Sequence, residues 1–171
     1  QVREALSRPE VSFIEQKEQL GTGHALMISS RELERSPSSS IVVLVGAAPL
    51  LQAETLRALV DYHDRTKAAA TILTTRVDDP RGYGRIVKGA GGRVRAIVEE
   101  KVCTPAQKKI RDISSGILCF SRMELLKYLP HLTDRNAQKE YLLTDLIEIF
   151  NRRKLKVMAF AVEDSREVLG V

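Results

Sequence analysis

Three short glycine-containing segments stand where the chain would change from strand to helix or turn. They are Leu20-Gly-Thr-Gly-His24, Gly46-Ala-Ala-Pro49 and Gly82-Tyr-Gly84. Glycine lets the backbone approach a ligand closely, and the N–H groups of such segments can bind phosphate oxygens or base edges. Each segment alone is also typical of simple turns. Since neither a GxGxxG pattern nor a Walker loop is present, no single motif identifies a nucleotide site.

Acidic side chains follow one apolar stretch, at Glu99-Glu100-Lys101. Carboxylates at the end of a strand can accept hydrogen bonds from sugar hydroxyls, although a solvated strand terminus has the same pattern. His24, His63 and His131 lie far apart in the sequence. We expect no metal-binding or catalytic role for them, and we expect His63 on an exposed helix face.

The elements that must position these residues alternate along the chain. A continuous apolar run at Ile41–Val45 predicts a strand buried on both faces. The other predicted strands are Val11–Ile14, Ala69–Thr75, Arg85–Lys88, Val94–Val98, Ser115–Phe120 and Val157–Val162, and the predicted helices are the end at Val2–Leu6, then Thr22–Leu33, Ala53–Lys67, Pro105–Arg111, Met123–Leu129 and Tyr141–Phe150. This order predicts an α/β fold with a mixed, mostly parallel sheet and a small antiparallel insertion.

Composition excludes several classes of protein. The 171 residues are enough for one domain, residues 1–171, and the net charge is +5. With 5% aromatic residues and no tryptophan, we expect no nucleic-acid partner. The run Arg152-Arg153-Lys154 is explained by the end of a helix. Two cysteines and no long apolar run favour a reduced, cytoplasmic protein without a membrane span.

Seven segments occur in an order that is more informative than any one of them. They are Gln16–Ala25, Gly46–Leu50, Asp79–Ile86, Ile97–Lys101, Ile113–Ile117, Asn136–Tyr141 with Leu143–Asp145, and Glu167–Val171. This series resembles the uridyltransferase domain of the bacterial bifunctional enzymes that make UDP-N-acetylglucosamine, which are N-acetylglucosamine-1-phosphate uridyltransferases and glucosamine-1-phosphate acetyltransferases. The resemblance covers nearly the whole chain.

The resemblance implies a Rossmann-like nucleotidyltransferase fold and a defined reaction. UTP and N-acetylglucosamine 1-phosphate would give UDP-N-acetylglucosamine and pyrophosphate, with Mg²⁺ as the metal. A sugar-phosphate oxygen would attack the α-phosphorus in line, and cationic groups would offset the developing charge. The implied uracil-binding residues are Gln16, Gly21 and Thr22. The implied sugar-binding residues are Gly84, Glu99, Ser114 and Thr144.

The sequence departs from the family pattern at the positions that serve catalysis. Ala47 stands where the family has the aspartate that holds Mg²⁺, and a methyl group cannot ligate this cation. Ser114 replaces a sugar-contacting asparagine, and the chain stops at Val171, just before the second metal ligand. The first strand and its Gly-rich phosphate loop are absent. We therefore expect no intact catalytic set, no metal ligands and impaired catalysis.

Three functional interpretations remain open. The chain is a part of a sugar-nucleotide uridylyltransferase, or a non-catalytic protein of the same fold that binds nucleotide sugars or acts as a scaffold, or a related sugar-phosphate nucleotidyltransferase. The start at Gln1 and the abrupt end favour the first. A sheet without its first strand exposes strand edges, so we expect instability or a homo-oligomer unless a segment completes it.

Overall fold

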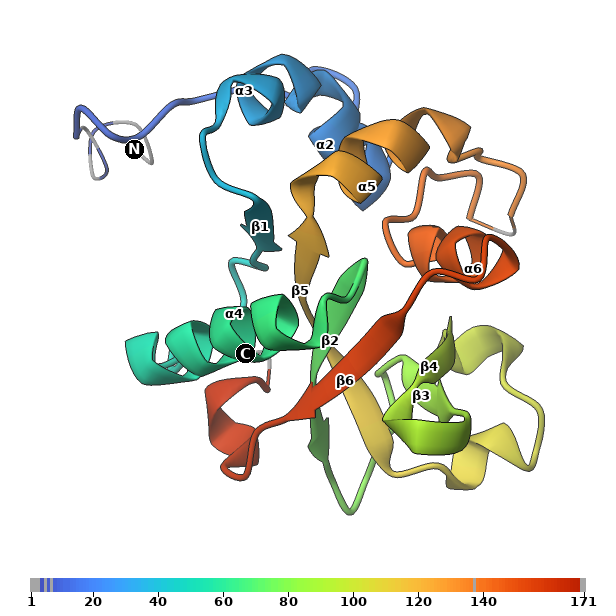
Figure 1. Cartoon of the computed structure of the whole chain (residues 1–171). Helices are drawn as coiled ribbons and strands as arrows, with labels where there is room; N and C mark the ends of the chain where they lie inside the picture. Colours follow the sequence, from blue (N-terminus) through green and yellow to red (C-terminus); the bar gives the residue numbers. More distant parts are fainter. Residues whose placement is uncertain (1–3, 5, 7, 137, 170–171) are drawn as a thin grey trace.

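A mixed sheet of six strands forms the centre of the computed structural model, which describes residues 4, 6, 8–136 and 138–169 (Figure 1). Within these residues the order is β4-β3-β5-β2-β6, and β1 pairs with β5. The strands are β1 (Ser40–Val43), β2 (Ala70–Arg76), β3 (Arg85–Lys88), β4 (Val94–Val98), β5 (Asp112–Ser121) and β6 (Val157–Ala161).

The mixed sheet and the antiparallel insertion β3–β4 are confirmed, but the balance of strand directions differs from the prediction. Among the described pairs, β2 and β6 are parallel. The other pairs are antiparallel, because β5 lies inside the sheet and runs opposite to β1, β2 and β3. The first half of β5 therefore lies at the carboxyl ends of β1 and β2, where ligands gather in α/β sheets.

The helices are α2 (Thr22–Ile28), α3 (Ser30–Arg35), α4 (Ala53–Thr66), α5 (Arg122–Tyr128) and α6 (Asp145–Arg152). Short 3₁₀ turns are η1 (Ala90–Gly92), η2 (Glu100–Val102), η3 (Gln107–Lys109), η4 (Leu129–His131) and η5 (Ser165–Glu167). No helix of the described residues is long and apolar enough to cross a membrane. Residues 2, 3 and 5 of the helix end predicted at Val2–Leu6 lie outside the described residues.

Several predicted elements differ from the structure. The helix predicted at Pro105–Arg111 is only the 3₁₀ turn η3, and the helix predicted at Thr22–Leu33 is divided at Ser29 into α2 and α3. Val11–Ile14 forms no strand, because no described strand pairs with it. The helix predicted from Tyr141 begins only at Asp145. The backbone N–H groups of Tyr141 and Leu143 donate to α2 and to the loop before it, so this stretch is extended against its neighbour instead of continuing the helix.

Alternating side chains of the central strands fill two apolar clusters, one on each face of the sheet. Ile72 and Phe120 belong to the cluster with α5 and α6. Leu73 and Cys119 belong to the second cluster, which packs on α4 and η5. Figure 1 shows α4 separated from α5 and α6 by the sheet. This alternation is the expected period-two pattern of a strand covered on both faces.

The strand β1 is an exception to this burial. Its four residues are all half-buried, so the prediction that it is buried on both faces is wrong. Among the described strands it pairs with β5 alone, and Leu44 and Val45 just after it are exposed.

Two titratable side chains, His63 and Cys119, are buried on the face of the sheet that packs on α4. The prediction that His63 is exposed is wrong: its side chain is buried, and its Nδ1 lies 2.9 Å from Thr71 Oγ1 on β2. Burial lowers the pKa of His63, against the charge of Asp64. Cys119 is completely buried, and burial raises the pKa of its thiol to about 12.

Candidate functional site

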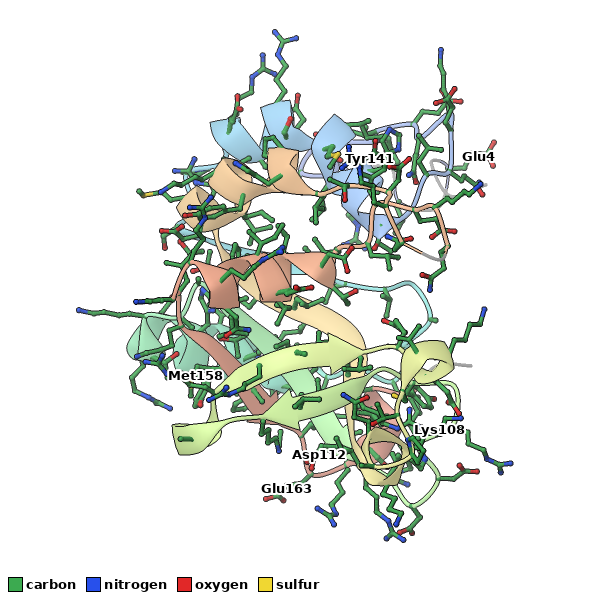
Figure 2. The ribbon with its side chains drawn as sticks, turned by 90° about the vertical axis from the view of Figure 1, so that its right-hand side faces the viewer. Glu4, Lys108, Asp112, Tyr141, Met158 and Glu163 are labelled. Carbon is green, nitrogen blue, oxygen red and sulfur yellow. The ribbon has the colours of Figure 1, made fainter. Side chains whose placement is uncertain are left out.

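The first glycine loop is tied to a distant extended segment. Gly23 N donates to Tyr141 O (2.7 Å), and Tyr141 N donates to Leu20 O (2.8 Å). Figure 2 shows Tyr141 beside the start of α2. Gly21 has a φ of +105° and ψ of 175°, and a Cβ there would come within 2.7 Å of Tyr141 O. Only glycine fits this backbone without strain.

Polar side chains of this loop line a cavity of about 340 Å³ with Gln19, Ala25 and Glu140. Gln16 Nε2 donates to Gly21 O and contacts His24 Nδ1, both at 3.1 Å. An amide nitrogen only donates, so His24 Nδ1 accepts, and these two contacts fix the orientation of the amide. Thr22 Oγ1 accepts from Leu143 N at 3.0 Å. The structure thus brings Gln16, Gly21 and Thr22 together around one cavity.

The second predicted group of residues surrounds the Gly82–Gly84 turn. Ser114 N donates to Gly84 O at 2.9 Å. A Cβ on Gly84 would lie 2.9 Å from Ile97 Cγ2 and 3.6 Å from Glu99 Oε1, so the Gly84 backbone faces the Glu99 carboxylate. A cavity of about 410 Å³ opens beside them, lined by Gly82, Glu99, Glu100, Lys101 and Gln138. Gly84, Glu99 and Ser114 therefore lie together.

Two carboxylates near this second cavity, those of Glu99 and Asp145, are partly buried. Burial raises the pKa of Glu99, and the charge of Asp145 raises it further. Burial also raises the pKa of Asp145, although a hydrogen bond from Asn136 opposes that shift. Thr144 immediately precedes Asp145 and lies at the amino end of α6. Asp145 therefore interacts electrostatically with Glu99, whereas Thr144 is not among the residues that line this cavity.

Residues 136 and 138–140 lie between the two cavities and are not among the predicted site residues. Gln138 lines the cavity at Glu99, and Glu140 lines the cavity at Gly21. Asn136 holds the segment in place, because its side chain donates to Glu140 O at 2.6 Å and accepts from Glu140 N at 3.3 Å. The available signal was the cluster of polar residues at 136–140 just before the Leu143-Thr-Asp145 segment.

The expected metal position offers no ligand. Ala47 lies exposed in the turn after β1. The residues that the structure describes contain no group of three or more His, Cys, Asp or Glu side chains that could hold a metal ion. Ala47 itself offers no oxygen ligand to Mg²⁺, a cation that is bound by carboxylate, phosphate and water oxygens.

The last predicted motif, Glu167–Val171, contacts α4 through Glu167. Glu167 accepts hydrogen bonds from Thr55 Oγ1 at 2.5 Å and from Gln52 N at 3.3 Å. These bonds fix η5 on the amino end of α4. Gly170 and Val171 lie outside the described residues.

The fold agrees with the comparison with known families. The family described as nucleotidyl transferase matches residues 2–165. The chain therefore belongs to the nucleotidyl transferase family, and the predicted fold class is confirmed.

Individual relatives identify a narrower group than the family does. Over 171 residues the chain is 44% identical to "Bifunctional protein GlmU" of Streptococcus equi subsp. zooepidemicus, covering 100% of this chain and 37% of the relative. It is 46% identical over 156 residues to the protein of the same name from Heliobacterium modesticaldum, covering 91% and 34%. For the Synechococcus relative the values are 45%, 100% and 26%. The expected resemblance is confirmed, and the chain spans about a third of its relatives' length.

Proposed function

We propose that the chain carries the uridine-binding and sugar-binding halves of a sugar-nucleotide uridylyltransferase, and that it binds UDP-N-acetylglucosamine while nucleotidyl transfer is impaired. The observation that carries this proposal is the pair of cavities on either side of residues 138–141. Gln16, Gly21 and Thr22, which the sequence assigns to uracil, line one cavity, and Glu99, which it assigns to the sugar, lines the other.

The first cavity supports recognition of uracil. The edge of this base presents one N–H donor between two carbonyl acceptors. The Gln16 amide is oriented by Gly21 O and His24 Nδ1 through its nitrogen, which leaves its oxygen to accept from the base N–H. Backbone N–H groups of the loop, Thr22 N among them, serve the carbonyl oxygens. A preoriented donor and acceptor pattern of this kind favours uracil over cytosine.

The second cavity supports recognition of a hydroxylated, acetylated sugar. An ionised Glu99 accepts hydrogen bonds from sugar hydroxyls, and such charge-assisted bonds are stronger than neutral ones. The Gly84 backbone lies next to this carboxylate, because any side chain at position 84 would collide with Ile97. Together these groups suit the N-acetyl sugar.

Impaired transfer follows from Ala47. In the proposed reaction, UTP and N-acetylglucosamine 1-phosphate give UDP-N-acetylglucosamine and pyrophosphate, and negative charge develops on the transferred phosphoryl group. The loss of one well-placed electrostatic contact typically costs about 2.7–4 kcal/mol of transition-state stabilisation. The described residues supply no carboxylate cluster to replace it.

One alternative has support of its own. A non-catalytic nucleotide-sugar-binding protein of this fold would keep both cavities and lack the metal ligand, as this chain does at Ala47. Binding alone does not separate the two functions, because both retain the same cavities. Turnover separates them.

The test is calorimetric titration with UDP-N-acetylglucosamine, UDP and UDP-glucose. We expect UDP-N-acetylglucosamine to bind more tightly than UDP, and Glu99→Ala to remove most of that difference. Glu54→Ala is the matched control, because Glu54 lies exposed on α4 in an ion pair with Arg57. An unchanged affinity in Glu99→Ala would contradict the assignment of the sugar cavity.

A second assay follows pyrophosphate release from UTP and N-acetylglucosamine 1-phosphate with Mg²⁺. We expect release at the background rate. Robust Mg²⁺-dependent turnover would overturn the impairment assigned to Ala47. A tighter complex with UDP-glucose would instead favour a nucleotidyltransferase for another sugar.

A further inference from the structure

A buried arginine lies next to the sugar cavity and has no role in the function proposed above. Arg85 is the first residue of β3, and its side chain is 1% exposed. Charged side chains are almost never buried without a partner. Its Nη1 donates to Tyr83 O, and its Nη2 lies 3.6 Å from Glu100 Oε2. The described residues and their surroundings give Arg85 Nε no acceptor.

Glu100 completes a clamp around the Gly82–Gly84 turn. The Glu100 carboxylate accepts from Gly82 N as well as pairing with Arg85. The turn is thus held at the Gly82 amide and at the Tyr83 carbonyl by one ion pair. A third bond, from Ser114 N to Gly84 O at 2.9 Å, fixes its far end on β5.

This clamp determines where the sugar cavity's two main groups stand. Glu100 directly follows Glu99, and Arg85 directly follows Gly84. The pair therefore joins the end of β4 to the start of β3 at the point where the Gly84 backbone faces the Glu99 carboxylate, with 3.6 Å between the Gly84 Cβ position and Glu99 Oε1. A change in the pair would alter this spacing before it altered the uracil cavity, whose lining comes from the α2 loop and Glu140.

We propose that Arg85 and Glu100 are a positioning pair that sets the sugar selectivity of the site by holding the Gly82–Gly84 turn against Glu99. This inference rests on the proposed function, because it concerns the sugar half of the same site. Neither side chain is assigned a contact with the reacting atoms.

The two partners are not equivalent electrostatically. Arg85 is buried, whereas the Glu100 side chain is 29% exposed. Removal of Glu100 leaves a buried guanidinium without an acid, which is strongly unfavourable. Removal of Arg85 leaves a carboxylate that water can reach. We therefore expect Glu100→Gln to disturb the turn more than Arg85→Met does.

The experiment compares the affinities of UDP-N-acetylglucosamine and UDP by calorimetry. We expect Arg85→Met to lower the ratio of the two affinities at least tenfold and to leave the UDP affinity within twofold. Arg85→Lys retains the charge and should restore part of the ratio. Glu100→Asp keeps the acid but shortens its reach, so it tests the same spacing in a protein with its ion-pair charges intact.

The matched control is Arg81→Met in the same loop. Arg81 pairs with Asp79 at 2.5 Å, but the two side chains are 81% and 56% exposed, so we expect the affinity ratio to stay unchanged. Equal weakening of both ligands by Arg85→Met, or no change in their ratio, would overturn the positioning role alone. A wild-type ratio near one would overturn the proposed function and this inference with it.

Discussion

The loop at Leu20–Gly23 and the turn at Gly46–Leu50 are both glycine-containing parts of one candidate site, but they are built in opposite ways. The loop is bonded to Tyr141 at two backbone positions, and Gly23 is buried. In the turn, Gly46 has open space around it, and Ala47 and Leu50 are exposed. The loop proposed to bind a base is therefore held in place by backbone hydrogen bonds, whereas the turn expected to serve a metal has Ala47 where an oxygen ligand is expected.

The largest expected effect contrasts the two glycines directly. Gly21→Ala forces a Gly-only backbone conformation, at about 1–3 kcal/mol, and overpacks Tyr141 O, at about 1–3 kcal/mol more. We expect a loss of roughly 2–6 kcal/mol in the free energy of unfolding in urea, on these two principles together. Gly46→Ala is the control, and it should change stability by less than about 0.5 kcal/mol. Equal losses would show that the two segments are not differently built.

A smaller effect should come from restoring the missing carboxylate. Ala47→Asp adds an oxygen ligand at an exposed position, so folding should be unaffected. We expect the affinity for UDP-N-acetylglucosamine to become Mg²⁺-dependent, with a gain of about tenfold, or about 1.4 kcal/mol. Calorimetry with and without Mg²⁺ measures it, and the unsubstituted chain is the control. Mg²⁺-dependent binding in both proteins would contradict the account of Ala47.

Next in size is the bond between Thr22 and Leu143. Thr22→Val removes the acceptor of Leu143 N, which should cost about 1 kcal/mol of stability and weaken UDP binding. Thr104→Val is a suitable control, since Thr104 Oγ1 also accepts from a backbone N–H, that of Gln107, but in an exposed turn. Thermal unfolding and UDP titration read out both variants. Identical shifts would argue against special rigidity of the α2 loop.

The smallest effect concerns pH. Because the pKa of Glu99 is raised in the folded protein, the folded state binds a proton more readily than the unfolded state does. This carboxyl therefore adds stability as pH falls from neutral through the raised pKa, and the gain levels off below the unfolded value near 4.5. We expect Glu99→Gln to melt at a higher temperature than the parent at pH 7 and to match it at pH 4. The opposite order at pH 7 would contradict the burial of this charge.

Local signals in the sequence predicted the parts of the fold that local chemistry decides. Short apolar stretches on either side of Gly89–Gly92 predict both β3 and β4, because the two strands of a hairpin are neighbours in the chain. His63 was placed on the wrong face, because the face of α4 that is buried depends on its contact with Thr71 of β2. That contact forms only when the sheet assembles.

In the candidate site too, local motifs predict some features, and contacts between distant residues decide others. The motif series placed Gln16, Gly21 and Thr22 in one loop, and the structure brings them to one cavity. The influence of Asp145 on Glu99 joins residues distant in the sequence, so no local pattern carries it. The sequence gives no sign that Arg85 is buried, because a charged residue next to a turn is normally solvated. The partner of its buried charge is Glu100, which lies in the 3₁₀ turn η2 after β4.

Because Cys119 is buried, the rate at which its thiol is modified reports how often the central strand β5 opens. Thiol reagents attack the thiolate, and with a pKa of about 12 in the folded protein Cys119 is silent at neutral pH until β5 separates from its neighbours. Cys103, half-buried with its Sγ 3.5 Å from Val98 O, should be labelled first. The delay between the two modifications then compares the opening of β5 with the exposure of the loop after η2.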